Sequence, residues 1–354
     1  MRLSVFLACL LLALPVHAED GALAPANPRA CVLLPLSGPH GGLGKRVLEA
    51  IETAWAEGNM APLAHHDTAG GVGVVARAVE EGCVGAIGGL GDKEAIALAD
   101  AAEAASLPLL ALGSVLDGRA RPHVVFMRTA RARLLGALAS YLVSNGVSSA
   151  VVLHGHDAFG RLAAASFKEA FEADHGRVLA VLPVPNTAKE QNEVAGRLAT
   201  ELGRGRECTR LAVFLAADIG LSARFVPFLD FHGVTRGKQD CPAPVLAGTS
   251  LWNDPVLVAR RGEALEGGIF ADVVVPSGEA ALLAEAADAA VLLATAVRAG
   301  RTSEGVAQVL SGEVSFRGHT GEVRLSEGAI QGRKVGIFTI RRGEIVPLPQ
   351  DEGR

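Results

Sequence analysis

Small polar residues, carboxylates and aromatic side chains follow several short apolar runs of this sequence, where they could hold a small polar molecule. Glycine and serine allow a close backbone approach to a ligand, and an aromatic ring can form the apolar wall of a cleft. The candidate ligand-binding residues are Ser37, Gly38, Gly91, Asp92, Gly113 and Ser114 in the first half of the chain, and Asp157, Phe159, Asp218, Thr249, Ser250 and Trp252 in the second. The chemistry they offer is binding.

Motifs of catalytic and cofactor sites give no support for an enzyme. The chain contains no G-x-S-x-G nucleophile motif, no P-loop and no H-E-x-x-H zinc motif. The segment 71–76 fits the dinucleotide pattern G-x-G-x-x-A. It follows the second apolar strand, however, and no acidic residue ends the next strand, so the start of a helix is the better interpretation. We therefore expect neither catalysis nor a cofactor.

Two groups of histidine and aspartate residues have the residue types of metal ligands. His65 and His66 would face opposite sides of a strand, so they cannot both reach one ion. His154, His156 and Asp157 could lie on one side, but histidine and aspartate at a strand end are more often solvated or hydrogen-bonded than metal-bound. We predict no metal site.

Four cysteines follow the first eighteen residues, and each lies at or just before the start of an apolar run. Cys31 and Cys83 belong to the first half of the chain, and Cys208 and Cys241 to the second. Four cysteines allow three pairings. The starts of two parallel strands can be neighbours, and an oxidising compartment favours disulfides, so we predict Cys31–Cys83 and Cys208–Cys241. The alternative is four buried thiols, since free cysteine is commonly buried.

The elements that must position these residues alternate regularly between strand and helix. Apolar runs such as VLLPL, VGAIGG, VVLHG and LAVFLAA are each followed by a segment with helical periodicity. This alternation predicts βαβ units and parallel sheets covered on both faces. Two such series predict an α/β fold with two doubly wound parallel-sheet lobes. The last part of the chain predicts β-strands with tight turns at Glu327-Gly328 and Arg342-Gly343.

The beginning of the chain and its charge bear on where it works. Arg2 precedes an apolar run from Leu3 to Leu14, and Ala18 ends a segment that suits a signal peptidase. This predicts a cleaved signal peptide over residues 1–18 and a periplasmic protein. No later segment is expected to cross a membrane. The formal net charge is −5 without a basic patch, which argues against nucleic acid as a partner.

Five stretches, spread over most of the chain, carry a family pattern. They are LLPLSGPHGGLGKRVLEAIETA from Leu33, VGAIGGLGDKEAIALADAAEAASLPLLALGS from Val84, FMRTARARLLGALASYL from Phe126, VVLHGHDAFGRLAAASFKEAF from Val151 and FRGHTGEVRLSEG from Phe316. Taken in order, they resemble the Leu/Ile/Val-binding family of type I periplasmic binding proteins. The resemblance implies two lobes with a ligand between them, outside the carboxyl ends of the parallel strands.

This architecture also implies three crossovers between the lobes. They are expected near Met127–Ala130, Ile269–Val275 and Phe316–Glu322. Lobe 1 is then expected to comprise residues 27–129 and 275–318, and lobe 2 residues 130–274 and 319–350.

The residues expected to bind an amino acid depart from the family pattern. The resemblance implies hydroxyls and backbone donors for the α-carboxylate on lobe 1, and a carboxylate and aromatics for the α-ammonium on lobe 2. Asp92 stands where a hydroxyl is expected and would repel a carboxylate, and Val115 replaces a threonine. Phe159 replaces an aromatic hydroxyl, and Asp218 is the candidate for the missing acid. Unpaired carboxylates at Asp92 and Asp218 would favour a ligand with an exposed ammonium group.

Two functional hypotheses follow. The first is an exported solute-binding protein that holds a small polar, amino-acid-like ligand in the interlobe cleft for an ABC-type transporter, with a membrane permease as its partner. The second rests on GTSLWNDP from Gly248 and EGGIFAD from Glu266, which resemble the penicillin-binding-protein activators of the bacterial envelope. That resemblance implies a regulatory protein that uses the same fold to bind a partner such as a cell-wall synthase.

Overall fold

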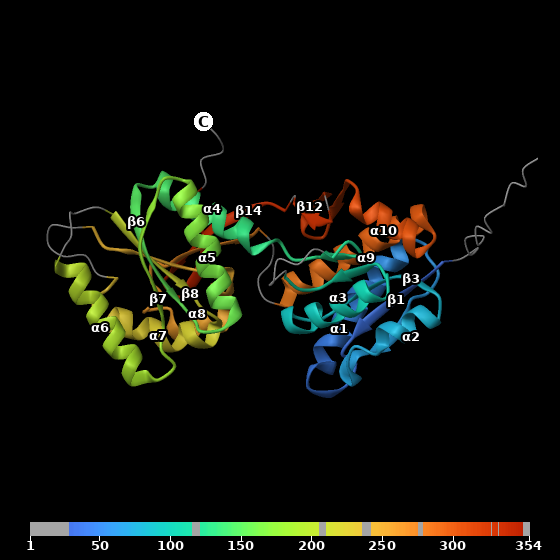
Figure 1. The fold of residues 1–354 in the computed structure, drawn as a ribbon, viewed down its shortest axis with the longest axis horizontal. Helices are drawn as coiled ribbons and strands as arrows, with labels where there is room; N and C mark the ends of the chain where they lie inside the picture. Colours follow the sequence, from blue (N-terminus) through green and yellow to red (C-terminus); the bar gives the residue numbers. More distant parts are fainter. Residues whose placement is uncertain are drawn as a thin grey trace, which may run out of the picture.

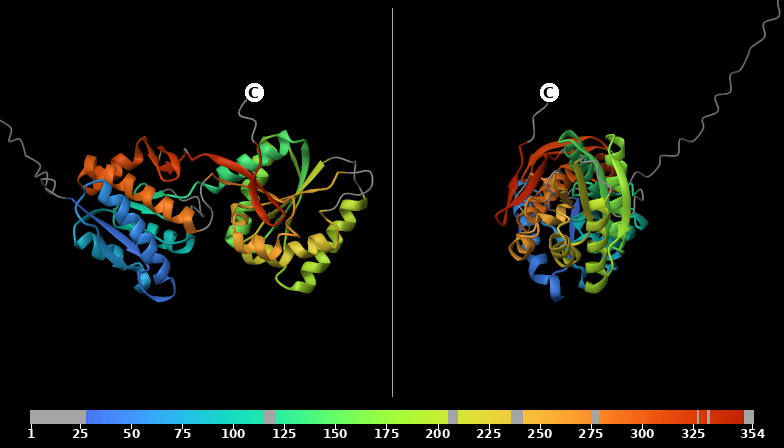
Figure 2. Two further views of the ribbon diagram at one scale, coloured as in Figure 1. Left: turned by 180° about the vertical axis from the view of Figure 1, so that it is seen from behind. Right: turned by 90° about the vertical axis from the view of Figure 1, so that its left-hand side faces the viewer.

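The computed structural model describes residues 28–114, 121–204, 210–235, 242–274, 279–326, 328–331 and 333–349. The chain forms two lobes that lie side by side, each built on one β-sheet (Figure 1). The view from behind shows the C-terminal segment, coloured red, passing from one lobe into the other (Figure 2). The predicted fold class, two doubly wound α/β lobes, is confirmed.

Lobe 1 contains an eight-stranded sheet in the order β11-β12-β13-β5-β4-β3-β1-β2. Its strands are β1 (Arg29–Leu34), β2 (Ala64–Asp67), β3 (Cys83–Gly88), β4 (Leu109–Ala111), β5 (Val124–Phe126), β11 (Val314–Gly318), β12 (Gly321–Ser326) and β13 (Ala329–Ile330). Its α-helices are α1 (Gly41–Glu57), α2 (Val74–Glu80), α3 (Asp92–Ala104), α9 (Glu279–Gly300) and α10 (Ser303–Ser311). Strands β1 to β5 pair in parallel, and β11 and β12 add an antiparallel hairpin at one edge.

Lobe 2 contains a seven-stranded sheet in the order β15-β14-β10-β9-β8-β6-β7. Its strands are β6 (Val147–His154), β7 (Arg177–Pro183), β8 (Arg210–Ala216), β9 (Val245–Gly248), β10 (Ile269–Val273), β14 (Val335–Arg341) and β15 (Glu344–Pro347). Its α-helices are α4 (Arg131–Ser144), α5 (Ala158–Ala173), α6 (Ala188–Arg204), α7 (Ile219–Phe231) and α8 (Pro255–Arg261). Strands β6 to β10 pair in parallel, whereas β14 and β15 are antiparallel.

Helices cover both faces of each sheet, which is why most central strands are continuous apolar runs. In lobe 1, α1, α9 and α10 pack on one face, and α2 and α3 pack on the other. In lobe 2, α4 and α5 cover one face, and α6, α7 and α8 cover the other. Every residue of β3 is buried, as is every residue of β1 after the first. The core therefore consists of four apolar layers, two in each lobe.

The first two crossovers lie at or beside their expected positions. The chain leaves lobe 1 after β5 and enters α4 of lobe 2, so Met127–Ala130 is the first crossover. The second was expected near Ile269–Val275. Most of that range is β10, which pairs with β9 and β14 inside the lobe 2 sheet. The chain therefore passes back to lobe 1 only after β10 ends.

The third crossover differs from the expectation. Phe316–Glu322 is the tip of the β11–β12 hairpin, in which Gly318 pairs with Gly321 inside the lobe 1 sheet. The next strand, β13, also pairs within lobe 1, with β5. The chain crosses only between β13 and β14, so the expected boundary at residue 318 is too early. The turn at the hairpin tip resembles a crossover in sequence because both combine glycine with polar residues.

Helix α9 is long and apolar enough, by length and composition alone, to cross a membrane, although no such segment was expected. In its most apolar window 67% of the residues are buried, and the helix packs against α1, α10 and β3. It also carries two buried carboxylates, Glu285 and Asp288. Helix α9 is therefore the central helix of the lobe 1 core.

The predicted disulfide between Cys31 and Cys83 is present, with the two Cα atoms 6.0 Å apart. It joins β1 to β3, which are direct neighbours in the sheet. The other pair, Cys208 and Cys241, lies outside the described residues, as do residues 1–18. The Cys208–Cys241 bond therefore stays a prediction.

Replacing Cys31 and Cys83 together by alanine is expected to lower the free energy of unfolding by about 2–5 kcal/mol, the usual cost of losing a native disulfide. The bond closes a loop between residues that are 52 apart in sequence, so its loss increases the entropy of the unfolded chain. Denaturant titration of the oxidised protein and the variant measures the difference. Mass spectrometry of non-reduced peptides tests both bonds, and a peptide linking Cys83 to Cys208 would contradict the assignment.

Candidate functional site

A cavity of about 380 Å³ lies between the two lobes. Its walls come from loops at the carboxyl ends of the parallel strands, from the end of β10, from the first crossover and from the beginning of α9. The lining residues include Leu43, Asp92, Ser114, Arg128, Thr129, Arg131, Leu134, Phe159, Ile219, Ser250, Leu251, Asn253, Asp254, Asp272, Val273, Glu279, Ala281, Leu282 and Glu285. This is the edge at which open α/β sheets bind ligands.

Four of the residues singled out from the sequence line this cavity: Asp92, Ser114, Phe159 and Ser250. Asp92 is the first residue of α3, and its Oδ1 accepts a hydrogen bond of 2.8 Å from the backbone N–H of Ser114. Its Oδ2 lies 3.8 Å from Nη2 of Arg131. Asp92 is therefore not the unpaired carboxylate that was expected, because a cation at the start of lobe 2 faces it.

Arg131 is a cavity residue that the sequence analysis did not identify. It is the first residue of α4, and its guanidinium lies over the ring of Phe159, 4.3 Å from the ring centroid. The side chain is only 13% exposed, and this burial lowers the pKa of Arg131. Within the described part of the chain its guanidinium donates no hydrogen bond. A nearly buried guanidinium with free donors suits a carboxylate ligand.

Asp157 and Asp218 have a structural role at the start of helices. Asp157 caps α5 by accepting a hydrogen bond of 2.7 Å from the N–H of Gly160. Asp218 caps α7 by accepting one of 2.6 Å from the N–H of Leu221. Neither carboxylate lines the cavity. Asp92 and Asp218 are therefore not brought together, and an aspartate after a strand is explained here by N-capping.

The loop at Ser37 and Gly38 also lies outside the cavity lining. Asp67 at the end of β2 accepts hydrogen bonds from the backbone N–H groups of Leu36 at 2.8 Å and Ala69 at 3.0 Å. Hydrogen bonds from the Ser37 side chain and from the backbone of Ala69 lower the pKa of Asp67 to about 2. Ser37 is thus engaged by Asp67.

Gly91 and Gly113 shape the loops beside the cavity without lining it. Gly91 precedes α3 with a φ of 82°, a conformation that favours glycine. A Cβ atom on Gly113 would lie 2.5 Å from the Cβ of Ala95, so glycine is needed there for close packing. Both residues allow Asp92 and Ser114 to meet.

Thr249 and Trp252 belong to the lobe 2 core. Trp252 is fully buried, and its Nε1 donates a hydrogen bond of 3.2 Å to Oγ of Ser222. Gly248 packs directly against the indole ring, and Thr249 is 2% exposed. The segment that resembles penicillin-binding-protein activators therefore places its aromatic residue inside the protein, away from any partner.

Asp272, another cavity residue missed in the sequence, lies at the end of β10. Its Oδ2 accepts a hydrogen bond of 2.9 Å from Nδ2 of Asn253, and its Oδ1 accepts one of 2.8 Å from the N–H of Val273. Burial raises the pKa of Asp272. Glu285 also lines the cavity, with its Oε2 3.5 Å from Nε of Arg128. The cavity therefore presents charges of both signs.

A buried ionic network lies directly behind this wall and ties the crossovers together. Arg333, just before β14, donates a hydrogen bond to the carbonyl of Met127 in the first crossover. Its Nε donates one of 3.0 Å to Oγ1 of Thr320. Its guanidinium lies 3.4 Å from Glu285 and 3.6 Å from Asp288. Burial raises the pKa of Glu285, and Arg333 opposes that effect.

The missed residues share a signal that the sequence contains. Arg128 and Arg131 lie in and directly after the first crossover, and Asp272 lies at the end of β10, just before the chain returns to lobe 1. Charged residues in or next to a crossover lie close to the cleft, because the crossovers join the two lobes there. The metal-ligand types at His154 and His156 form no cluster among the described residues.

Comparisons with known proteins agree with this architecture. The family model for periplasmic binding proteins matches residues 29–253. No curated protein sequence matches the chain. Among solved structures, a candidate branched-chain amino acid ABC transporter from Rhodospirillum rubrum has a TM-score of 0.74 at 19% identity, over 91% of this chain and 100% of that chain.

Two further structures are similar. A leucine-binding protein from Thermotoga maritima has a TM-score of 0.69 at 19% identity, over 91% of this chain and 98% of that chain. A solute-binding protein of an ABC transporter from R. palustris, in complex with benzoate, has a TM-score of 0.64 at 17% identity, over 91% and 95%. With two doubly wound lobes around a cavity at their strand ends, the chain is a member of the type I periplasmic binding proteins.

Proposed function

We propose that this protein is the solute-binding component of an ABC importer and that it binds a small, amino-acid-like carboxylate in the interlobe cavity. The observation that carries the proposal is the guanidinium of Arg131, which is nearly buried and donates no hydrogen bond within the described residues. A planar guanidinium can hold a carboxylate through two parallel hydrogen bonds. Phe159, on which it stacks, fixes its orientation.

The related structures support a carboxylate as the common element. Leucine, named for the T. maritima protein, and benzoate, named for the R. palustris protein, both carry one. They differ in that leucine also carries an ammonium group. The choice between these two classes therefore depends on the acidic groups of this cavity.

Asp272 and Glu285 favour the class with an ammonium group. Both line the cavity, and burial raises the pKa of each carboxyl group. A ligand ammonium beside them would favour the ionised carboxylates, because an opposite charge offsets the cost of burial. Asn253, which donates to Asp272, keeps that carboxyl in place. A zwitterion with its carboxylate at Arg131 could pair with cavity charges of both signs.

The proposal extends to the location and partner of the protein. Residues 1–18 have the pattern of a cleaved signal peptide, and solute-binding proteins of ABC importers work in the periplasm. We therefore place the mature protein there, with a membrane permease as the partner that receives the ligand.

Replacing Arg131 by glutamine is expected to weaken binding of the ligand by roughly 10- to 150-fold, which corresponds to the 1.5–3 kcal/mol of a hydrogen bond to a charged group. Calorimetric titration with L-leucine, L-isoleucine, other L-amino acids and benzoate measures the effect. Binding of an L-amino acid and not of benzoate is the expected outcome for the wild type.

Arg224→Gln is the matched control, because Arg224 is exposed on α7 and lies outside the cavity lining. It removes the same charge from the same lobe and should leave the affinity unchanged. Equal affinities in Arg131→Gln and the wild type would refute the carboxylate assignment. Selective binding of benzoate would replace the zwitterion with a simple aromatic acid.

A further inference from the structure

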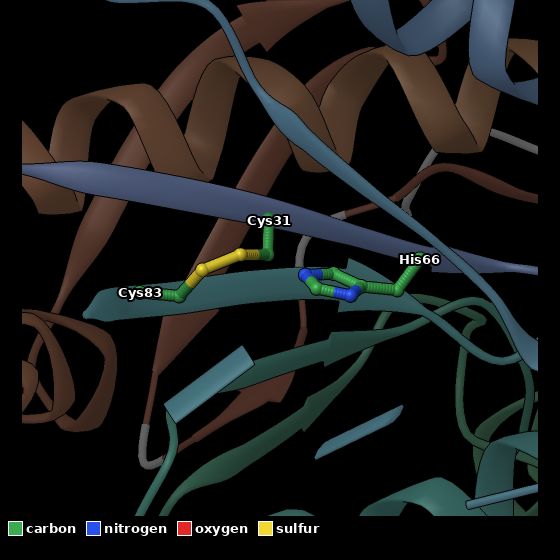
Figure 3. Close-up of side chains that lie close together, drawn as sticks. All are labelled: Cys31, His66 and Cys83. Atoms are coloured by element: carbon green, nitrogen blue, oxygen red, sulfur yellow. A yellow bond between two sulfur atoms is a disulfide. The ribbon is translucent and has the colours of Figure 1, made fainter. Parts of the chain in front are cut away.

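A second group of reactive side chains lies in lobe 1, in the buried layer between the sheet and α2. Cys31, His66 and Cys83 each offer a ligand atom, and these atoms lie within 4.8 Å of one another. All three residues are buried. The imidazole of His66 points toward the disulfide (Figure 3). Within the described part of the chain, no other group of three such residues has this geometry.

The strand register explains why these residues meet. In the β1–β2 pair, His66 lies two residues beyond the partner of Cys31, so the two side chains share one face of the sheet. Cys83 begins β3, on the other side of β1. His65 faces the opposite way, and its Nε2 lies 3.0 Å from Oε1 of Glu52. The sequence alone predicts that His65 and His66 face opposite sides of the strand. It does not predict that His66 lies beside Cys31 and Cys83.

The polar tip of His66 has no structural partner that explains its burial. The residue is 7% exposed, and its Nε2 makes no hydrogen bond with the described residues. An acidic oxygen, Oε2 of Glu81, lies 3.7 Å away, beyond hydrogen-bonding distance. Glu81 follows α2 and is half-exposed. A buried polar atom without a hydrogen bond is costly, so this nitrogen points to a ligand.

We propose that the reduced form of lobe 1 binds Zn²⁺ through the thiolates of Cys31 and Cys83 and the imidazole of His66, with Glu81 as the fourth ligand. Two sulfurs, one nitrogen and one oxygen are a donor set that zinc accepts in tetrahedral geometry. Bond lengths of about 2.0–2.3 Å place such ligand atoms roughly 3.3–3.8 Å apart. Side-chain rotation can close the remaining difference once the sulfurs are no longer bonded to each other.

The disulfide and the zinc site exclude each other because they use the same two sulfur atoms. A dithiol reductant breaks the S–S bond, supplies two electrons and two protons to the sulfurs, and becomes a disulfide itself. Zinc binding then releases the two thiol protons to solvent. Glu81 is half-exposed, so a zinc ion can reach the site from solvent beside this side chain. The site is independent of the cavity ligand, since Cys31 and Cys83 lie toward the starts of β1 and β3 and the cavity lies beyond their ends.

The test uses the full chain reduced anaerobically with a phosphine, which takes oxygen from water and leaves two thiols. Titration with Co²⁺ is expected to give a thiolate-to-cobalt charge-transfer band that saturates at one ion per chain, and Zn²⁺ should then displace the cobalt. Zinc should also raise the melting temperature of the reduced protein, because it binds the folded state. The oxidised protein should show neither effect.

His66→Gln is expected to weaken zinc binding by roughly tenfold or more, since even indirect partners of zinc ligands have effects of 10- to 100-fold. His65→Gln is the matched control and should keep the wild-type affinity. Circular dichroism of each oxidised variant confirms that it folds. Three outcomes overturn the proposal: no charge-transfer band in the reduced wild type, equal affinities in the two histidine variants, or zinc that fails to raise the melting temperature or to restore the fold of the reduced chain.

Discussion

Replacing Arg333 by methionine is expected to lower the free energy of unfolding by about 3–5 kcal/mol, the usual cost of removing one partner from a buried ionic group. The side chain of Arg333 is completely buried between Glu285 and Asp288, which are themselves almost entirely buried. Methionine fills much of the volume but removes the guanidinium beside Asp288 and leaves Glu285 with Arg128 alone. It also removes the donor to the carbonyl of Met127, a polar group that needs a partner when it is buried.

Urea denaturation followed by circular dichroism measures this effect. Arg324→Met is the control, because Arg324 lies on β12 in an exposed ion pair with Glu322. Exposed ion pairs contribute about 0–1 kcal/mol, so this variant should resemble the wild type. A loss of less than about 1 kcal/mol in Arg333→Met would contradict the structural role of the network, since breaking a buried pair costs more than that.

Arg333 also bears on how the lobes move. It lies in the third crossover and contacts the first, and Glu285 reaches Arg128 on the cavity side. Crossovers absorb the rotation when two lobes close around a ligand. The network therefore joins the cavity wall to the first and third crossovers through one continuous set of contacts.

Trp252→Ala is expected to destabilise the protein by about 3–5 kcal/mol, as for other large aromatic residues removed from a core. The indole is fully buried, and Gly248 and Gly268 leave room for its ring. Alanine would leave a cavity in lobe 2 and an unpartnered hydroxyl at Ser222, which now accepts the indole hydrogen bond. The expected effect is on stability and not on recognition.

Thermal unfolding and calorimetric titration separate the two effects. Phe231→Ala is the matched control, because Phe231 is also in lobe 2 but is 76% exposed, and surface substitutions usually change stability by less than about 0.5 kcal/mol. If the Trp252→Ala protein kept its stability but lost ligand or partner binding, the prediction would be wrong. The segment would then have the partner-binding role that its resemblance implies.

The sequence was most informative where a local pattern and the fold impose the same requirement. A strand buried on both faces must be apolar throughout, so β1, β3 and β8 were recognisable, and the alternation with helices indicated parallel sheets. The Cys31–Cys83 pairing followed from the same reasoning, since adjacent parallel strands bring their starts together. The position of the first crossover was implied by the family resemblance, and the structure has it between a strand of lobe 1 and a helix of lobe 2.

The residues of the candidate site were predicted less well, for a physical reason. Aspartate at a strand end suits a ligand and a helix N-cap equally well, and the sequence does not distinguish them. Asp157 and Asp218 cap helices, whereas Asp92 reaches Arg131 across the lobes. The sequence likewise does not show whether Trp252 lines a cleft or lies in the core. Its ring is buried because Gly248 and Gly268 leave space for it.

The sequence by itself therefore determined the α/β class and the two lobes, which follow from periodicity and chain order, and its family resemblance indicated the edge of the sheets where the cavity lies. Only the tertiary structure decided which charges meet. The pairing of Asp92 with Arg131, the burial of Arg333 between two carboxylates and the approach of His66 to Cys31 each join segments distant in sequence. Such contacts depend on strand register and on side-chain packing, and neither is encoded in any local pattern.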